Sequence, residues 1–453
     1  MTSDRALAIT AAVALGCGAA PGTPAGPALS AADSAMIDEL EHRTFDWFWT
    51  TADPVTGLVP DRAPTPSFSS IAAVGFGLTA YAIGAERGWV SRADARDRVI
   101  KTLTFFRDAP QGDAATGMTG YKGFYYHFLD MHTGQRYRDV ELSSVDTALL
   151  LAGVMFCREY FAGGDEAPLR QLADTLLERV DWTWMQPRAP AIAMGWQPEH
   201  GFIAYDWLGY NEGMIVQLLA LGSPSHPVVP ATWDAWQKNY DKTWGPAYGQ
   251  TLLGFPPLFG HQYSHLWVDF RGIRDRYMAT RGLDYFENSR RATLAQRAYA
   301  IANPDGWTGY SAEVWGLTAS DGPGDMTRVI NGKDRTIRGY AARGMASYDD
   351  GTIAPAAMIG SIAFAPELVV PGIRALKQRY GDKIYRPLGF ADAFNPTLDW
   401  VDPDALGIDQ GPIIGMIENF RSELVWATMR KSGYLQRALR RAGFTGGWLE
   451  AGS

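Results

Sequence analysis

One carboxylate in this chain stands where a protein would place a proton donor. Glu212 follows Asn211 and precedes an apolar run, 215–222, that has the composition of a buried helix. Three aromatic residues lie just upstream: Tyr205, Trp207 and Tyr210. A carboxyl group surrounded by aromatic rings is poorly hydrated, which disfavours its charged form and raises its pKa. The pattern therefore predicts a general acid at Glu212.

Two further predicted helices also begin with acidic residues. One starts in the segment 141–146, which holds Glu141 and Asp146, and the other starts near Asp409. Acidic residues are favoured in a first helical turn because they interact with its free N–H groups, and Ser143 with Asp146 fits a capping box. Each residue alone is consistent with a helix cap. Their recurrence beside aromatic residues favours a carbohydrate-cleaving site.

Hydrolysis of a glycosidic bond needs two carboxyl groups, one that protonates the leaving oxygen and one that activates water or attacks carbon. Sugar rings bind on Trp and Tyr because their C–H faces are apolar. The chain has 16 Trp and 20 Tyr. Several tryptophans fall outside the predicted helices: Trp196, Trp207, Trp244, Trp307, Trp315 and Trp400. We expect aromatic residues of these loops to form sugar subsites.

Motifs for other chemistries are incomplete. His261 and His265 have the spacing of zinc ligands on one helical face, but Gln262 replaces the Glu that the zinc-protease pattern requires. The segment 321–325, Asp-Gly-Pro-Gly-Asp, does not meet the calcium-loop pattern. The segment 75–77 lacks the third glycine of a dinucleotide-binding fingerprint. We therefore expect no metal and no cofactor, and we expect His261 to bind substrate hydroxyls.

The composition is that of a globular protein with a large core. Of 453 residues, 46% are hydrophobic and 20% are charged, and the net charge is −8. The absence of a run rich in Lys and Arg argues against nucleic acid as a partner. The acidic balance also argues against a polyanionic substrate.

The N-terminal segment has the features of an export signal. Arg5 precedes the small apolar run 6–15, which is too short to cross a bilayer. We interpret residues 1–17 as a signal segment, of lipoprotein type if Cys17 is acylated, and the Ala-, Gly- and Pro-rich residues 18–32 as a linker. The expected location is the periplasm or the extracellular space, with Cys17 as a candidate lipid anchor and no transmembrane span.

Residues 33–445 have the pattern of a single all-α domain. The periodicity predicts helices over 33–51, 70–87, 91–107, 143–161, 166–184, 211–222, 230–241, 264–281, 286–302, 354–364, 366–380, 412–430 and 432–442. Nearly all-apolar stretches such as 148–156 alternate with amphipathic ones such as 167–179, so buried helices are paired with covering helices. This pairing predicts an (α/α)₆ barrel, or toroid. A two-domain bundle fits less well because no linker interrupts the pattern.

The connections between the predicted helices are long and rich in Gly and aromatic residues, over 108–142, 185–210, 242–263 and 303–353. Loops of this length in a compact domain usually carry function. Within the first of them, residues 123–142 predict a small β-hairpin at the cleft. This hairpin would bring Glu141 and Asp130 to the same rim.

Six segments carry a resemblance to a known family: ELSSVDTALLLAG at 141–153, YNE at 210–212, PLFGHQYSH at 257–265, YFENSRRA at 285–292, DGTIAP at 350–355 and LGIDQGP at 406–412. They resemble the bacterial glucoamylase-like hydrolases, a family that includes the β-1,2-glucanases. The resemblance implies an (α/α)₆ barrel and action on β-1,2-linked glucans, as an endo-glucanase or a sophorose-releasing exo-enzyme.

The resemblance also implies roles for individual residues. Glu212 matches the general acid, and Glu141 stands where an opposing carboxylate is expected. Asp409 stands where other α/α-barrel glycosidases keep their base, so the second carboxylate is Glu141 or Asp409. The acidic residues held in reserve are Asp130, Asp139, Asp146 and Glu313. The predicted substrate-binding residues are Tyr126, Asp130, Asp146, Trp207, Tyr210, His261, Tyr263, Glu313 and Trp315.

We therefore expect a monomeric glycoside hydrolase that cleaves β-1,2-glucan or oligosaccharides derived from it. The alternatives are a β-1,2-glucan transglycosylase, a non-catalytic periplasmic glycan-binding lipoprotein, and a polysaccharide lyase on the same toroid. Product analysis separates a hydrolase from a lyase and a binder, because only a lyase leaves an unsaturated sugar and only a binder leaves the glycan intact.

Overall fold

The structure is a computed structural model that describes residues 29–450. The predicted signal segment 1–17, with Cys17, lies outside the described residues, as does most of the predicted linker 18–32. Helix α1 begins at Ala31, slightly before the predicted start of the domain at residue 33. The Ser30 hydroxyl sets this start because it accepts a hydrogen bond from the Asp33 N–H group, 3.1 Å away.

The described chain is mostly helical, as predicted. Its α-helices are α1 (Ala31–Thr51), α2 (Ile71–Glu86), α3 (Arg92–Asp108), α4 (Ser144–Tyr160), α5 (Ala167–Arg179), α6 (Met214–Gly222), α7 (Ala231–Gln237), α8 (Tyr240–Thr243), α9 (Tyr263–Trp267), α10 (Arg276–Arg281), α11 (Tyr285–Ala302), α12 (Pro355–Ile359), α13 (Pro366–Tyr380), α14 (Gly407–Ser422), α15 (Leu424–Met429) and α16 (Gly433–Arg441). The predicted ranges of α1 to α4, α11, α13 and α16 agree with these bounds to within two residues at either end.

Several predicted helices are wrong in length or continuity. The range 264–281 holds two helices, α9 and α10, because the chain is extended at Val268 and Arg274 then pairs with Thr445. The range 230–241 is divided into α7 and α8, and α12 covers only the first part of 354–364. Long-range contacts made by these segments outweigh their local helical preference.

The predicted helix 412–430 is wrong in two respects: the observed helix begins earlier, and it ends before residue 430. Helix α14 begins at Gly407, because strands β1 (Arg62–Ala63) and β19 (Ala405–Leu406) pair and the Gly407 N–H group then donates to the Asp61 carbonyl. It ends at Ser422, since Glu423 adopts a left-handed conformation with φ 58° and separates α14 from α15.

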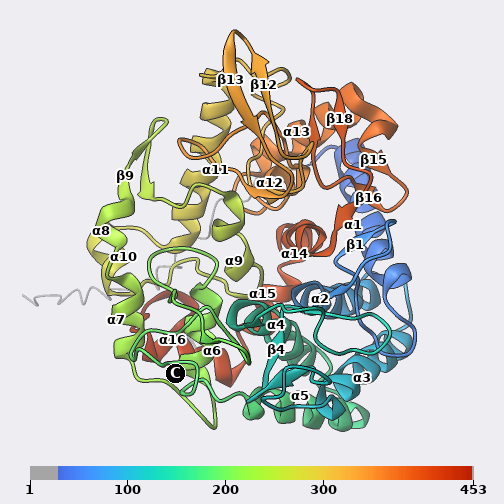
Figure 1. The fold of residues 1–453 in the computed structure, drawn as a ribbon, viewed down its shortest axis with the longest axis vertical. Helices are drawn as coiled ribbons and strands as arrows, with labels where there is room; N and C mark the ends of the chain where they lie inside the picture. Colours follow the sequence, from blue (N-terminus) through green and yellow to red (C-terminus); the bar gives the residue numbers. More distant parts are fainter. Residues whose placement is uncertain (1–28, 451–453) are drawn as a thin grey trace, which may run out of the picture.

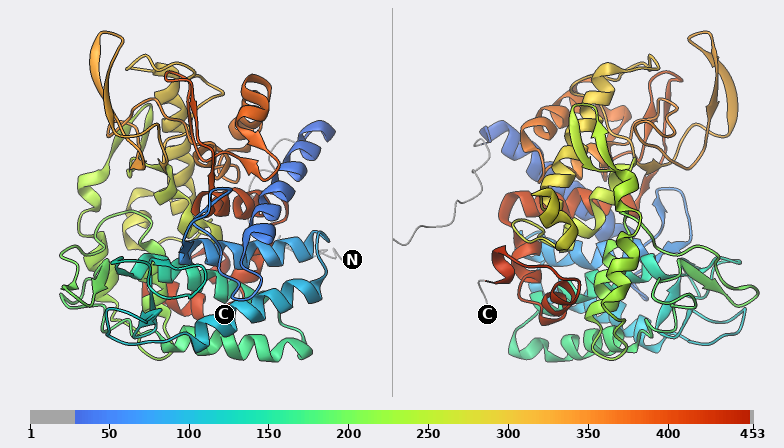
Figure 2. Two further views of the ribbon diagram at one scale, coloured as in Figure 1. Left: turned by 45° about the vertical axis from the view of Figure 1, so that its right-hand side comes forward. Right: turned by 90° about the vertical axis from the view of Figure 1, so that its left-hand side faces the viewer.

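Short strands occupy the long connections, so the chain is not purely α-helical. The remaining strands are β2 (Ser69–Ser70), β3 (Gly120–Tyr121), β4 (Phe124–Tyr126), β5 (Phe128–Leu129), β6 (Leu142–Ser143), β7 (Gly195–Gln197), β8 (Gly201–Phe202), β9 (Trp244–Ala247), β10 (Gln250–Leu253), β11 (Ala319–Ser320), β12 (Met326–Ile330), β13 (Lys333–Ile337), β14 (Ala341–Ala342), β15 (Tyr385–Arg386), β16 (Gly389–Phe390), β17 (Phe394–Asn395) and β18 (Trp400–Val401). The β12–β13 hairpin projects beyond the helices (Figure 2).

The hairpin predicted over 123–142 belongs to a larger sheet. Strand β4 pairs antiparallel with β6, and the sheet continues in the order β3-β4-β6-β7-β8. Leu129 also pairs with Arg136 across the turn, where Gly134 has a φ of 70° that suits glycine. Two loops that are far apart in sequence, 108–142 and 185–210, are therefore joined next to the start of α4.

The chain travels around the molecule and returns to its starting point (Figure 1). Helix α2 packs against α4, and α14, near the end of the chain, packs against the opposite side of α2. Glycines make the first contact close: a Cβ on Gly153 would lie 2.1 Å from the Gly75 carbonyl oxygen. A side chain on Gly411 of α14 would likewise meet the ring of Phe76 in α2.

Buried hydrophobic residues from Ile37 to Leu449 form one continuous core. Helix α2 lies deep in it, with nearly all of its residues buried. Among the helices of residues 29–450, none is long and apolar enough to cross a membrane.

Candidate active site

Glu212 lies in a turn immediately before α6. The predicted helix start at Asn211 is wrong: the Asn211 side chain accepts a hydrogen bond from the Gly213 N–H group at 2.9 Å, and the helix begins at Met214. One carboxyl oxygen, Oε2 of Glu212, is buried and has no hydrogen-bond partner. Burial, assisted by the negative charge of Asp146, raises the pKa of Glu212 to about 7. Glu212 therefore retains its proton in a substantial fraction of molecules at neutral pH.

Two of the aromatic residues near Glu212 in sequence, Trp207 and Tyr210, are buried and held by contacts with other residues. Trp207 is 6% exposed, and its indole N–H group donates to the Ser144 hydroxyl at 2.8 Å. Tyr210 is 3% exposed and stacks on Tyr285, with the ring centroids 5.8 Å apart. Tyr205, in contrast, points into solvent. Trp207 and Tyr210 are thus largely buried, and their contact with sugar stays a prediction.

A histidine that the sequence analysis did not single out joins two predicted carboxylates. His127 follows β4 and Glu141 precedes β6, so the pairing of these strands places them side by side. Nδ1 of His127 lies 2.9 Å from Oε1 of Glu141, and Nε2 lies 3.5 Å from Oδ1 of Asp146. Asp146 sits in the first turn of α4, where its N–H group donates to the Ser143 hydroxyl, as the capping-box pattern predicts.

The charges of this trio are mutually dependent. Burial alone would lower the pKa of His127, but Asp146 and Glu141 outweigh it and raise the pKa to about 9. Burial opposes ionisation of Glu141, yet its contact with His127 keeps the pKa of Glu141 below its ordinary value. Burial raises the pKa of Asp146 despite the nearby imidazolium. At neutral pH the site therefore holds a cationic His127 between acidic groups.

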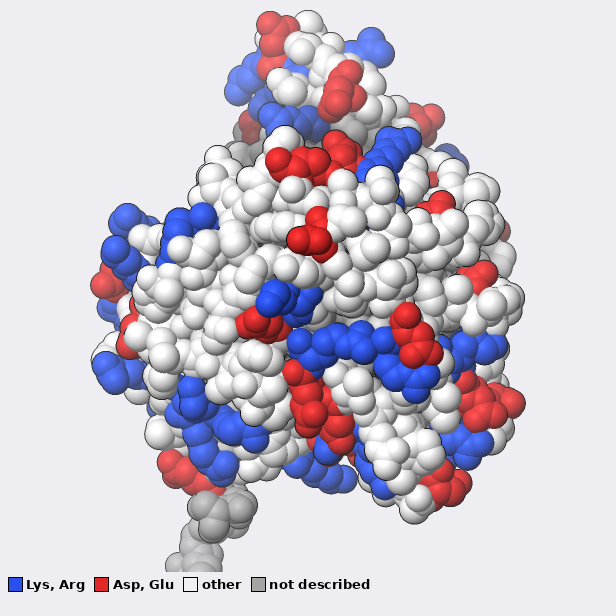
Figure 3. All heavy atoms as spheres, turned by 60° about the horizontal axis from the view of Figure 1, so that its bottom comes forward, with Lys and Arg blue, Asp and Glu red and all other residues white. Residues whose placement is uncertain are grey.

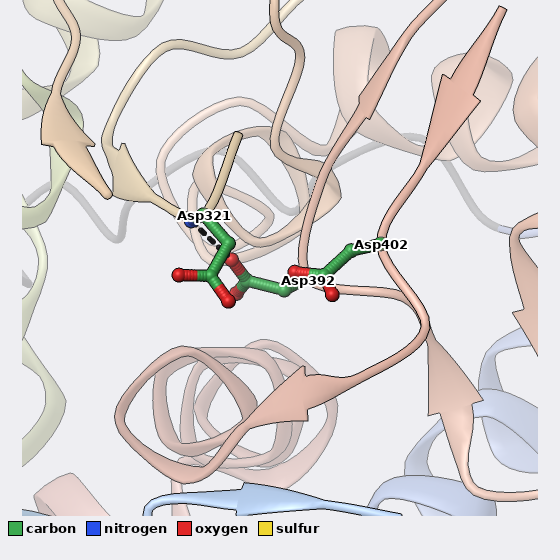
Figure 4. A group of neighbouring side chains, drawn as sticks. All are labelled: Asp321, Asp392 and Asp402. Carbon is green, nitrogen blue, oxygen red and sulfur yellow. Dashed lines mark hydrogen bonds between the residues drawn. The ribbon is translucent and has the colours of Figure 1, made fainter. Parts of the chain in front are cut away.

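A second acidic cluster surrounds Asp409. Asp409 lies in the first turn of α14, and the nearby acidic residues are Asp61, Asp321, Asp392 and Asp402. The Asp321 N–H group donates to Oδ2 of Asp392 at 2.8 Å (Figure 4). Burial raises the pKa of Asp409 to about 7 and the pKa of Asp392 well above its ordinary value. After burial, the charge of Asp409 is the largest cause that raises the pKa of Asp392.

Tyr263 connects the two halves of the site. Burial, followed by the charges of Asp409 and, to a smaller extent, Glu212, raises the pKa of Tyr263 well above its ordinary value. The phenol is therefore neutral and stands within electrostatic reach of both carboxyl groups. Asp61 forms a further link, because the charges of His127 and Asp321 both act on it.

The two predicted histidines are buried and neutral. Nε2 of His261 lies 3.2 Å from the Phe255 carbonyl oxygen, and burial lowers the pKa of His261 to about 4. Nε2 of His265 lies 3.0 Å from the Ser289 hydroxyl. Within residues 29–450, the group of three side chains close enough to share a metal ion consists of Asp321, Asp392 and Asp402, not of these histidines.

The remaining predicted residues have other environments. The carboxylate of Asp130 accepts hydrogen bonds from the His132 and Thr133 N–H groups in the hairpin turn. Glu313 pairs with Arg379 at the surface, and Asp139 is exposed. The structure therefore does not bring Glu313 into the cluster around Glu212.

Two predicted aromatic residues lie in the interior. Tyr126 is fully buried, and the Arg136 guanidinium lies over its ring at 4.8 Å. Trp315 is 1% exposed. Both side chains pack in the core, and their predicted contact with substrate stays a prediction.

Five residues of the site were missed in the sequence: Asp61, His127, Asp321, Asp392 and Asp402. His127 stood within the predicted hairpin, 14 residues before Glu141, and that spacing on two paired strands was a usable signal. The four aspartates come from separate loops and carry no common local motif.

The chain resembles solved structures in both sequence and shape. A putative glucoamylase from Bacteroides uniformis is 32% identical with a TM-score of 0.82, and the match covers 93% of this chain and 99% of that chain. An endo-β-1,2-glucanase from Chitinophaga pinensis, solved with sophorotriose and glucose, is 29% identical with a TM-score of 0.81 over 93% of this chain and 100% of that chain.

A characterised relative is longer. The exo β-1,2-glucooligosaccharide sophorohydrolase (non-reducing end) of Parabacteroides distasonis is 28% identical over 443 residues, which cover 90% of this chain but only 58% of that protein. The family described as "Putative glucoamylase" matches residues 204–433, a range that includes Glu212, Tyr263, Asp321, Asp392, Asp402 and Asp409. The chain belongs to this glucoamylase-like family.

Proposed function

We propose that this protein is a glycoside hydrolase that cleaves β-1,2-glucan or oligosaccharides derived from it. The observation that carries the proposal is Glu212, whose buried, unpartnered oxygen and raised pKa suit a general acid near neutral pH. The relatives from Chitinophaga pinensis and Parabacteroides distasonis, both named for activity on β-1,2-linked glucose, support the linkage.

In the proposed mechanism, Glu212 protonates the leaving glycosidic oxygen and a second carboxylate activates water. We assign the second role to Asp409. Its Oδ2 is buried without a hydrogen-bond partner, so this oxygen is available to accept a proton from water. Oε1 of Glu141 is already bound to His127, which makes Glu141 the less basic alternative.

In this proposal, the trio of His127, Glu141 and Asp146 positions the carboxyl groups and takes no part in proton transfer. The imidazolium fixes both carboxylates, and the charge of Asp146 helps Glu212 to retain its proton. The trio therefore connects the strand pair β4–β6 and the start of α4 to the acid at the start of α6.

A neutral glucan fits the charges better than a polyanion. Besides Glu212 and Asp409, the two clusters hold six carboxyl groups, those of Glu141, Asp146, Asp61, Asp321, Asp392 and Asp402. Their negative charge would repel an anionic polymer. On the face shown in Figure 3, basic and acidic residues are interspersed and form no large basic patch. This distribution disfavours a lyase that acts on uronates.

We also propose that the helices close into an (α/α)₆ barrel. In support, α2 contacts α4, α4 contacts α6, α6 contacts α9, and α12 contacts α14, which returns to α2. A second set of helices covers the first, since α1 and α3 contact α2, α5 contacts α4, α16 contacts α6 and α13 contacts α12. Residues 33–445 would then be one domain.

We propose a periplasmic or extracellular location, on the evidence of the N-terminal sequence alone. Residues 1–17 have the composition of an export signal and Cys17 is a candidate for acylation. The glucan would then meet the enzyme outside the cytoplasm.

The proposed activity is tested by incubating the purified protein with linear and cyclic β-1,2-glucan, laminarin and starch. We expect short β-1,2-linked products from the β-1,2-glucans and none from laminarin or starch. Longer products would indicate transfer, an unsaturated product would indicate a lyase, and intact glucan that is nevertheless bound would indicate a binding protein. Activity on starch alone would contradict the proposed linkage.

The assignment of the base is tested by comparing two variants, Asp409→Asn and Glu141→Gln. Removing an acid or base commonly costs about 10²–10⁴ in rate, and we expect the loss in full for Asp409→Asn. Proton NMR of the first-formed anomer shows whether the enzyme inverts or retains. If Glu141→Gln is the more damaging change and azide restores it, Glu141 is the second carboxylate.

A further inference from the structure

Three aspartates from separate loops converge beside Asp409 (Figure 4). Asp321 follows β11, Asp392 lies between β16 and β17, and Asp402 follows β18. One carboxylate oxygen from each lies within 4.8 Å of the others. In Figure 4 the three side chains point toward a common space.

Each carboxylate is held by one of its oxygens. Oδ2 of Asp392 accepts from the Asp321 N–H group, and Oδ1 of Asp402 accepts from the Asp404 N–H group at 3.0 Å. Oδ2 of Asp321 pairs with Arg62. These contacts orient all three groups without using their second oxygens.

The second oxygens supply an independent observation. Oδ1 of Asp392 and Oδ2 of Asp402 are buried and have no hydrogen-bond partner, and these residues are only 1% and 2% exposed. A buried oxygen that is left without a partner costs roughly 1–3 kcal/mol, more when it is charged. Such atoms in native proteins usually have a ligand or water that completes them.

The negative charge of the surrounding carboxyl groups also favours a bound cation. Together with Asp61 and Asp409, the three aspartates make five carboxyl groups, and Arg62 is the basic side chain that pairs with Asp61 and Asp321. A cation would compensate this negative charge while also occupying the free oxygens.

We propose that Asp321, Asp392 and Asp402 bind a divalent cation of the calcium type. The donor set is entirely oxygen, which suits a hard cation and not zinc. Calcium takes oxygens at about 2.3–2.6 Å, so two ligands on opposite sides stand at most roughly 5 Å apart. Magnesium demands near-ideal octahedral geometry and loses its waters reluctantly, so three carboxylates fixed by separate loops suit the more flexible coordination of calcium better.

The site differs from a calcium-binding loop in its construction. Asp321 stands in the segment 321–325, whose sequence does not meet the calcium-loop pattern. Its partners come from 71 residues farther along the chain and beyond, so the ligands are assembled by the tertiary fold. The site is independent of the proposed reaction, because cation binding needs no glucan.

The proposal is tested on full-length protein stripped of metal with a chelator and titrated with calcium chloride in a calorimeter. We expect one site per chain and a higher melting temperature with calcium than without it. Magnesium chloride at the same concentration should bind more weakly. Equal or tighter binding of magnesium would overturn the choice of calcium, and the absence of heat and of a thermal shift with both salts would overturn the site.

Two variants distinguish the loss of a calcium ligand from misfolding of the protein. Asp402→Asn removes a buried ligand, and Asp321→Asn removes one that is only partly buried and whose loss the fold should tolerate better. Each should weaken calcium binding by about tenfold or more. The matched control is Asp382→Asn, an exposed position in a 3₁₀ turn, which should bind like the wild type.

A third measurement addresses the rival occupant, a sugar hydroxyl. Sophorose is titrated into the metal-free and calcium-loaded protein. If calcium gives no heat while Asp392→Asn and Asp402→Asn abolish sophorose binding, the free oxygens bind sugar and the cation site is wrong. Loss of calcium binding in Asp321→Asn, with the fold intact by circular dichroism, supports the site whether or not the protein cleaves glucan.

Discussion

Glu212 obtains its chemical character from its surroundings. A free glutamate has an ordinary pKa of 4.5 and would be ionised at neutral pH, but burial raises the pKa of Glu212 to about 7. The turn before α6 holds the side chain there, and the nearby Trp207 and Tyr210 are fixed by contacts with Ser144 and Tyr285. An acid that is half protonated near neutral pH is close to the optimum for proton transfer.

The first prediction concerns catalysis by Glu212. Glu212→Gln should lower kcat by about 10²–10⁴ while leaving glucan binding intact, because the amide cannot donate a proton as the acid does. In the wild type, kcat/KM should be highest near pH 7, because Glu212 loses its proton above about 7 and Asp409, the proposed base, gains one below about 7. Steady-state kinetics from pH 5 to 9 measure both. Glu367→Gln, which breaks a surface pair with Arg290, is the control and should retain full activity.

The second prediction concerns stability. The pKa of Glu212 is raised in the folded state, so its contribution to stability is fully present below its ordinary value of 4.5 and is lost as the pH rises through about 7. Glu212→Gln removes this dependence. We therefore expect the variant to gain stability relative to the wild type between pH 5 and pH 8, measured by thermal melting. A constant difference across this range would mean that Glu212 is not buried as a neutral acid.

The third prediction concerns His127. Its pKa is raised from 6.5 to about 9, so the stability it contributes is fully present below pH 6.5 and is lost as the pH rises through about 9. His127→Gln leaves Glu141 and Asp146 without their cation and should cost about 1–3 kcal/mol at neutral pH. Denaturation at pH 7 and pH 10 measures the difference, which should shrink at the higher pH. His226→Gln, at an exposed position, should cost little at either pH.

At the scale of elements, helix starts and strand pairs position the chemistry. The pairing of β4 with β6 sets His127 against Glu141, the first turn of α4 adds Asp146, and the β1–β19 pair fixes the start of α14 and so the place of Asp409. No single element supplies all the residues of the proposed active site. Each supplies one carboxyl group or the histidine that pairs with it.

The fourth prediction concerns the contact of α2 with α4. A Cβ on Gly153 would lie 2.1 Å from the Gly75 carbonyl oxygen, so Gly153→Ala must push the two helices apart. Overpacking of this kind typically costs about 1–3 kcal/mol. Urea denaturation measures it. Gly433→Ala is the matched control, because the space around Gly433 in α16 is open and the change should be neutral or slightly stabilising.

Activity should respond to the same change. Helix α4 carries Asp146, so a shift of α4 relative to α2 would also move the partner of His127. If Gly153→Ala keeps wild-type stability and activity, the close approach of α2 and α4 is not required.

At the scale of the whole molecule, the chain returns to α2 through α14, and this return brings the two ends of the described sequence to one site. Asp61 lies near the beginning of the chain and Asp409 near its end, yet the Asp61 carbonyl accepts from the Gly407 N–H group. The main hydrophobic core, whose members run from Ile37 to Leu449, packs both parts of the chain together.

The fifth prediction concerns location. If Cys17 is acylated, the protein should sediment with membranes, and Cys17→Ser should move it to the soluble fraction of the periplasm or to the medium. Cell fractionation followed by immunoblotting measures this. Cys157→Ser is the control, since Cys157 is buried in α4 and should not affect location. Unchanged sedimentation of Cys17→Ser would exclude a lipid anchor at this residue.

Features that depend on local preference and pattern could be predicted from the amino-acid sequence alone. Apolar and amphipathic periodicity located most long helices, and the motifs around Glu212, Glu141 and Asp409 identified the family and three acidic groups that the structure places in or beside the two clusters. Caps such as Ser143 with Asp146 were also readable, because such hydrogen bonds involve residues only a few positions apart.

Which side chains are in contact and which are buried depends on the tertiary fold. Periodicity could not reveal that α14 begins at Gly407, because a strand pair with residues near the start of the chain sets that position. It could not reveal that Trp207, Tyr126 and Trp315 are buried, since loop residues have no periodicity from which burial is read. The group of Asp321, Asp392 and Asp402 was invisible for the same reason: its members share no spacing, and only the fold brings their oxygens within 4.8 Å.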